Sequence, residues 1–86
     1  MALTVRYFAA LRDRMGTSEE TLDTADLGAA IASPAALVDW LCDRDGNAQA
    51  LSEASVRVII NDEIRSREHA LEDGDVIAFC PPFSGG

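Results

Sequence analysis

The chain has 86 residues, and its hydrophobic fraction of 48% supports one folded domain with a single core rather than a disordered segment. Its 7 basic and 15 acidic residues give a net charge of −8, which argues against nucleic acid as a partner and favours a protein with a basic face. No apolar run approaches the roughly 20 residues of a membrane-spanning helix and no signal-like leader opens the chain, so we expect a cytoplasmic location.

The first quarter of the chain predicts a strand, a short helix and a second strand. Apolar and polar side chains alternate over residues 3–8, which is typical of a strand with one buried face. Phe8 falls on the opposite face, where either the following segment covers it or a partner contacts it. Strong helix formers fill residues 9–15 and Gly16 ends them, while residues 17–24 fit a strand that pairs back on the first.

The middle of the chain predicts the main helix. We expect residues 25–32 to form a connector. Ser33 is a capping residue and Pro34 suits the first helical position, so the helix begins there and runs to about Arg44. Residues 48–53 fit one further helical turn.

The last third of the chain predicts three strands. Residues 56–60 are β-branched and almost continuously apolar, which predicts a central strand buried on much of both faces. A turn at Asn61-Asp62 leads into a short strand over residues 63–65. We expect Gly74 to adopt positive φ in a turn that delivers residues 76–80 as the last strand.

This order of elements predicts an α+β fold. A sheet of four to five strands carries one main helix across one face. The last strand is apolar at successive positions, so we expect it to run through the middle of the sheet.

The potential ligands for metals are few and scattered. Cys42 and Cys80 have no CxxC spacing, and His69 is the only histidine, so we expect reduced, largely buried thiols and no metal site. The chain also lacks a phosphate-binding glycine-rich loop and any lysine, so we expect no bound cofactor and no ATP site of its own.

The last residues form a distinctive tail, Pro81-Pro82-Phe83-Ser84-Gly85-Gly86. Proline ends strand pairing and stiffens the exit, and glycine lacks the Cβ that would block a narrow channel. The part beyond Pro81 reaches at most about 16–18 Å, enough to enter a neighbouring active site. We therefore predict a domain over residues 1–81 and a flexible tail over residues 82–86, whose reactive group is the Gly86 carboxylate. The alternative is a frayed terminus without a role.

An apolar surface is predicted at the base of this tail. Strand parity places six residues on the face opposite the core: Arg6, Phe8, Arg57, Ile59, Ala78 and Cys80. The residues that we expect to contact a partner are Phe8, Ile59, Cys80, Pro81, Pro82, Phe83, Ser84 and Gly85.

Four stretches together resemble the MoaD family of ubiquitin-like β-grasp proteins, the small subunits of molybdopterin synthase. They are Phe8–Arg12 followed by Gly16, Ile60–Glu63, Leu71–Asp75 and Ala78–Gly86. The likeness extends over essentially the whole chain, and the ending with two prolines and two glycines after an Asp-Gly-Asp turn is its most specific part. Cys80 and Phe83 depart from the residues usual in the family.

The resemblance implies a sulfur carrier that is not an enzyme by itself. A separate adenylating enzyme uses ATP to activate Gly86, and a sulfur donor then converts it to a thiocarboxylate. The large synthase subunit receives the tail, and the sulfur passes to a cyclic pyranopterin precursor of the molybdenum cofactor. The resemblance also implies a heterotetramer of two small and two large subunits.

Three other functions remain open. The chain could carry sulfur for thiamin or cysteine synthesis, although thiamin-type carriers are usually shorter. It could be a ubiquitin-like modifier that forms an amide between Gly86 and a lysine of a target protein. It could also be a binding module with an inert tail.

Overall fold

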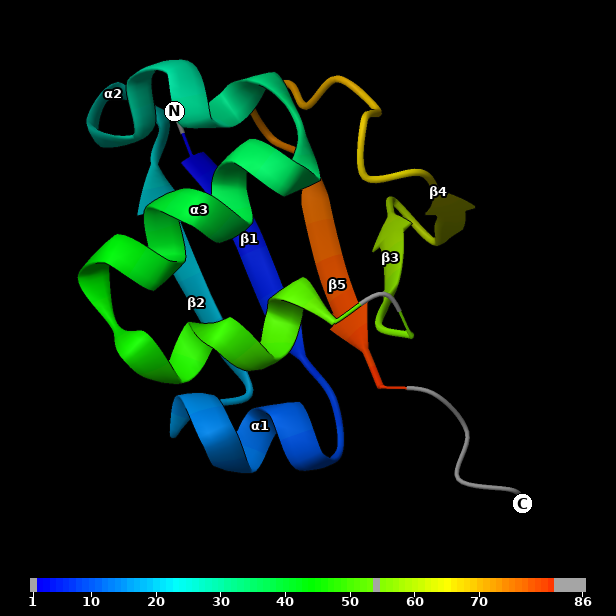
Figure 1. Cartoon of the computed structure of the whole chain (residues 1–86). Helices are drawn as coiled ribbons and strands as arrows, with labels where there is room; N and C mark the ends of the chain where they lie inside the picture. The colour runs from blue at the N-terminus through cyan, green and yellow to red at the C-terminus, as the bar shows by residue number, and fades with distance from the viewer. Residues whose placement is uncertain (1, 54, 82–86) are drawn as a thin grey trace.

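The computed structural model describes residues 2–53 and 55–81, which form one five-stranded sheet with helices on one face (Figure 1). The strands are β1 (Ala2–Tyr7), β2 (Glu19–Asp23), β3 (Arg57–Ile60), β4 (Glu63–Arg65) and β5 (Val76–Cys80). The helices are α1 (Ala10–Met15), α2 (Thr24–Leu27) and α3 (Pro34–Arg44), with 3-10 helices η1 (Gly28–Ala32) and η2 (Gly46–Ser52).

The sheet is mixed, with the strand order β2-β1-β5-β3-β4. β1 is antiparallel to β2 and parallel to β5, while β3 is antiparallel to both β5 and β4. The main helix α3 crosses one face, and α1 lies at the end of the sheet where β5 finishes (Figure 1). The predicted α+β architecture and the central position of the last strand are both confirmed.

The first strand–helix–strand unit follows the predicted pattern. Leu3, Val5 and Tyr7 alternate along β1 and are all buried, so the inward face is the predicted one. Gly16 ends α1 with φ of 75°, a left-handed conformation that favours glycine. β2 then pairs back on β1, with Leu22 buried opposite Leu3.

The predicted connector over residues 25–32 is instead helical. Asp23 accepts a hydrogen bond from the Ala25 N–H (2.9 Å) and so caps α2, which continues into η1. Leu27 and Ala30 from this segment are buried in the core. The helical pattern was not recognised in the sequence because the segment consists mostly of small residues and Gly28, and only Leu27 and Ala30 are buried.

The main helix begins and ends where predicted. The Ser33 hydroxyl accepts a hydrogen bond from the Ala36 N–H (3.2 Å), and Pro34 occupies the first helical position. Leu37, Val38 and Leu41 form its buried face. The helical turn expected over residues 48–53 is the longer 3-10 helix η2, capped by the Asp45 carboxylate on the Asn47 N–H (3.0 Å).

The prediction that residues 56–60 form the central, doubly buried strand was wrong. β3 lies between β5 and the edge strand β4, with Arg57 exposed and Ile59 only half-buried. The strand buried on both sides is β5, where Ile77, Ala78 and Phe79 are at most 6% exposed. β-branched residues favour a strand because they pack well on a pleated surface, and a run of them does not by itself indicate burial on both faces.

A polar network joins α3 to the first two strands at the edge of the core. The Tyr7 hydroxyl donates to Glu20 (2.7 Å), and Arg44 binds both Glu20 carboxylate oxygens (2.8 and 2.9 Å). The Arg44 hydrogen bond holds the pKa of Glu20 below its ordinary value, while burial and then the bond to Glu20 raise the pKa of Tyr7. The Tyr7 ring also stacks on Phe79 with centroids 6.2 Å apart, so the network supports the neighbouring strand β5.

Candidate functional site: the outer face of the sheet and the end of β5

The helices cover one face of the sheet and leave the other face open (Figure 1). Strand register places one residue from each strand in a row across this outer face, in the order Glu19, Arg6, Ala78, Ile59 and Ile64. The three apolar members of the row come from β5, β3 and β4. The outer face is therefore polar toward β2 and apolar toward β4.

A second row lies nearer the end of β5. Arg57 is opposite Cys80 in the register, and the Phe8 N–H donates to the Phe79 carbonyl (3.2 Å). Phe8 thus lies beside the last residues of β5 and is 44% exposed, whereas the preceding residue Tyr7 is buried. The register agrees with the prediction that six residues share the face opposite the core: Arg6, Phe8, Arg57, Ile59, Ala78 and Cys80.

We define the outer patch as Phe8, Ile59, Ile64, Ala78 and Cys80. Ile64 is 65% exposed, and it and Phe8 are the large hydrophobic side chains exposed in the described part of the chain. Sequence reasoning missed Ile64. The two-residue turn before it contained the signal, because a turn of that length sets Ile64 opposite Ile59.

The hairpin that carries Ile59 and Ile64 is bonded to the start of β5. Asn61 and Asp62 have φ of 51° and 70°, as a two-residue turn between twisted strands requires. The Asn61 side chain donates to Asp75 (2.9 Å) and accepts from the Val76 N–H (3.0 Å). Gly74, with φ of 88°, turns the chain so that its N–H donates to the Ala2 carbonyl (2.9 Å). These contacts fix β5 relative to both neighbouring strands.

The outer face carries two arginines with different partners. Arg6 forms an ion pair with Glu19 (2.9 Å), and both side chains are about half exposed. Within residues 2–53 and 55–81, Arg57 makes no ion pair or hydrogen bond through its side chain. Among the described residues, Arg57 is therefore a positive charge beside the end of β5 without a side-chain partner.

Neither cysteine is activated as a nucleophile. Burial raises the pKa of the Cys80 thiol, and burial followed by the nearby Asp39 and Asp43 charges raises that of Cys42. Both are free and half-buried thiols. The described ranges also contain no group of three histidine, cysteine, aspartate or glutamate side chains able to hold a metal ion.

The tail begins where β5 ends. Pro81 follows Cys80 directly and is half-buried. The other predicted tail residues, Pro82, Phe83, Ser84, Gly85 and Gly86, lie outside the described residues, so the division at residue 81 stays a prediction. Among the described helices, none has the length and apolar character needed to span a bilayer.

Comparison with known sequences gives full-length matches. The ThiS family matches residues 5–86. The molybdopterin synthase sulfur carrier subunit of Escherichia coli is 32% identical over 85 residues, which cover 98% of this chain and 99% of that subunit. The protein of the same name from Haemophilus influenzae is 34% identical with the same coverage.

Comparison with solved structures identifies the same fold. The solution structure of small archaeal modifier protein 1 from Methanosarcina acetivorans is 26% identical, with a TM-score of 0.74 and coverage of 99% and 96% of the two chains. A chain from the complex of subunits 1 and 2 of the molybdopterin-converting factor of Helicobacter pylori has a TM-score of 0.65 at 20% identity, with both chains fully covered. These likenesses confirm the ubiquitin-like β-grasp fold.

Proposed function

The chain belongs to the ThiS family, and from this premise we propose that it carries sulfur for molybdopterin synthase on the Gly86 carboxylate. Full-length similarity to two sulfur carrier subunits supports this proposal. The observation that carries it is the junction at Cys80 and Pro81. There the central, largely buried strand β5 ends beside the outer patch, and the sequence continues into a proline- and glycine-containing tail.

The chemistry of the tail requires a partner enzyme. A terminal carboxylate with a pKa of about 3.5 is ionised at neutral pH and is a poor electrophile. An adenylating enzyme would join the Gly86 carboxylate to the AMP part of ATP and release pyrophosphate. A sulfur donor would then displace AMP and leave a thiocarboxylate. ATP is a substrate of that enzyme, and we propose no cofactor bound to this chain; the need for ATP favours a cytoplasmic location.

The second partner in this proposal is the large synthase subunit. The Helicobacter pylori structure pairs a protein of this fold with subunit 2 of its molybdopterin-converting factor. We propose that the large subunit covers the outer patch together with Pro81, Pro82 and Phe83, and that Ser84 and Gly85 lead Gly86 into its active site. There the thiocarboxylate would give its sulfur to a cyclic pyranopterin precursor. The assembly would contain two small and two large subunits.

Mass spectrometry of the protein after incubation with ATP, the adenylating enzyme and a sulfur donor tests this proposal. We expect a mass gain equal to the replacement of one oxygen by sulfur, located on Gly86. The charged protein should then convert the precursor in the presence of the large subunit. Conversion that persists after deletion of Gly86 would show that the sulfur travels by another route.

The modifier function is the second candidate, because the fold is shared with a small archaeal modifier protein. A modifier would form a stable amide with a lysine of a target protein. The chain has no lysine, so any conjugate between copies could form only through the α-amine. Conjugates that survive thiol treatment and carry Gly86 on a lysine would favour this function over sulfur transfer.

A further inference from the structure

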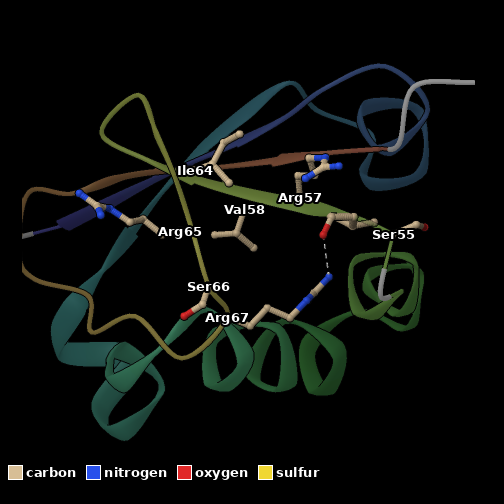
Figure 2. Close-up of a pocket in the computed structure, with 8 residues that line it drawn as sticks. Ser55, Arg57, Val58, Ile64, Arg65, Ser66 and Arg67 are labelled. Carbon is tan, nitrogen blue, oxygen red and sulfur yellow. Dashed lines mark hydrogen bonds between the residues drawn. The ribbon is translucent and has the colours of Figure 1, made fainter. Parts of the chain in front are cut away.

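A cleft of about 300 Å³ lies where β3 and β4 meet the segment that follows them (Figure 2). It is lined by Ser55, Val56, Arg57, Val58, Ile64, Arg65, Ser66 and Arg67. Val56 and Val58 are buried and give it an apolar floor, while Arg57, Arg65 and Arg67 surround it with positive charge. A ligand that fits this lining has an apolar part and a negative charge.

The cleft exists because β4 is shorter than its neighbour. β4 pairs with β3 only from Val58 to Ile60, so Arg57 at the start of β3 pairs with β5 on one side and has no strand on the β4 side. Arg67 lies along this edge (Figure 2) and donates to the carbonyls of Glu53 (2.6 Å) and Val56 (3.1 Å). The Val56 N–H is also bonded, to the Glu53 carbonyl (3.0 Å). The edge cannot accept an added strand, so recognition in the cleft depends on side chains.

The charge of the cleft contrasts with that of the chain. Of the seven cationic residues in a protein with a net charge of −8, three line this one cleft. Arg67 is committed to the two carbonyls, and Arg65 forms an ion pair with Glu63. Arg57 has no such partner among the described residues. A carboxylate of a binding partner would complement the positive charge of Arg57.

The cleft is continuous with the outer patch. Ile64 belongs to both, and Arg57 lies opposite Cys80 at the end of β5. A protein that covers the outer patch must therefore pass over Ile64 and Arg57 to the mouth of the cleft. We infer that the cleft receives an acidic segment of the large subunit, with an apolar side chain against Ile64 and a carboxylate on Arg57, which lies on the same outer face as Ile64. This inference rests on the proposed function.

The affinity of the large subunit from the same organism tests the inference. The variant Arg57→Gln removes this charge and leaves Arg65 and Arg67 to the contacts that they already make. The control is Gln49→Glu, which changes the net charge equally but at an exposed position of η2 in the helical layer. Loss of one exposed charge pair should weaken binding about two-fold, and the remaining affinity should depend less on salt. The control should bind as the wild type does.

Hydrogen exchange of the backbone amides of residues 55–58 and 64–67 shows whether contact is direct. We expect these amides to be protected in the wild-type complex. Unchanged affinity of the arginine variant, an equal loss in the control, or unprotected amides would each overturn the inference while the sulfur-carrier function stands. If the wild type itself does not bind the large subunit, the proposed partner is wrong and the inference fails with it.

Discussion

The two faces of the sheet are built from the same strands, but their apolar side chains differ in how far they are exposed to solvent. On the inner face, Leu3, Val5, Tyr7, Ile77 and Phe79 are at most 1% exposed and lie beneath the helices. On the outer face, exposure differs from one position to the next: Ala78 is 6% exposed, Phe8 is 44% exposed and Ile64 is 65% exposed. The inner face is packed for stability, whereas the outer face keeps the apolar side chains of Phe8 and Ile64 exposed to water.

This difference has a physical consequence. Apolar side chains on the inner face are removed from water when the protein folds, because helices of the same chain cover them. Apolar area left exposed becomes buried only when another protein arrives, and a contiguous exposed patch is a mark of such a contact. Substitutions on the inner face should therefore change the free energy of unfolding, and substitutions on the outer face should change the free energy of binding.

The largest expected effect is on the inner face, from Phe79→Ala in the central strand. Phe79 is fully buried and stacks on Tyr7, so the variant should lose about 3–5 kcal/mol in the free energy of unfolding. The matched change on the outer face, Ile64→Ala, should alter it by less than about 0.5 kcal/mol. Urea denaturation followed by circular dichroism measures both. Equal losses would mean that the outer face is also part of the stabilising core.

The next effect is on binding, from Phe8→Glu in the outer patch. We expect the affinity for the large subunit to fall at least ten-fold, because a charge replaces an exposed aromatic side chain of the kind that dominates interfaces. The stability of the free protein should change little. Isothermal titration calorimetry provides the affinity, and Gln49→Glu at an exposed position of η2 controls for one added negative charge. If both variants bind as the wild type does, Phe8 is not part of the interface.

A smaller effect concerns the polar network at the rim of the inner face. The Arg44 hydrogen bond lowers the pKa of Glu20, so the ionised carboxylate stabilises the fold above its ordinary pKa of 4.5. That contribution is lost as the pH falls through the lower, folded-state pKa. Glu20→Gln should therefore cost about 1 kcal/mol at pH 7 and should approach the wild type in stability at acid pH. Parallel pH curves of the two proteins that never converge would argue against this linkage.

Sequence patterns anticipated the inner face better than the outer one. Period-two alternation in β1 and the Ser33-Pro34 start of α3 are local signals, and both appear where expected. Two errors have one origin. The position of β3 next to an edge and the helical form of residues 24–32 depend on which elements lie alongside, and that is a property of the whole fold.

The candidate site shows the same division. The outward parity of Phe8, Ile59 and Cys80 could be read from single strands, and the register agrees with it. Ile64 could be added only once the turn at Asn61 and Asp62 set the register of β4. The arginine-lined cleft could not be predicted, because it depends on the β3–β4 pairing stopping at Val58 and leaving the start of β3 without a partner on that side. The functions of the tail residues remain predictions.

The smallest expected effect comes from Arg6→Gln at the polar end of the outer row. Its ion pair with Glu19 is about half exposed, so loss of the pair should change the free energy of unfolding by less than about 0.5 kcal/mol. The same variant should leave Glu19 without a partner on the outer face, and binding should weaken less than in Phe8→Glu. Denaturation measures the change in the free energy of unfolding of this variant, and calorimetry measures the change in its affinity for the large subunit. A stability loss near that of Phe79→Ala would show that outer-face charges also maintain the fold, and the separation of stability from binding would then fail.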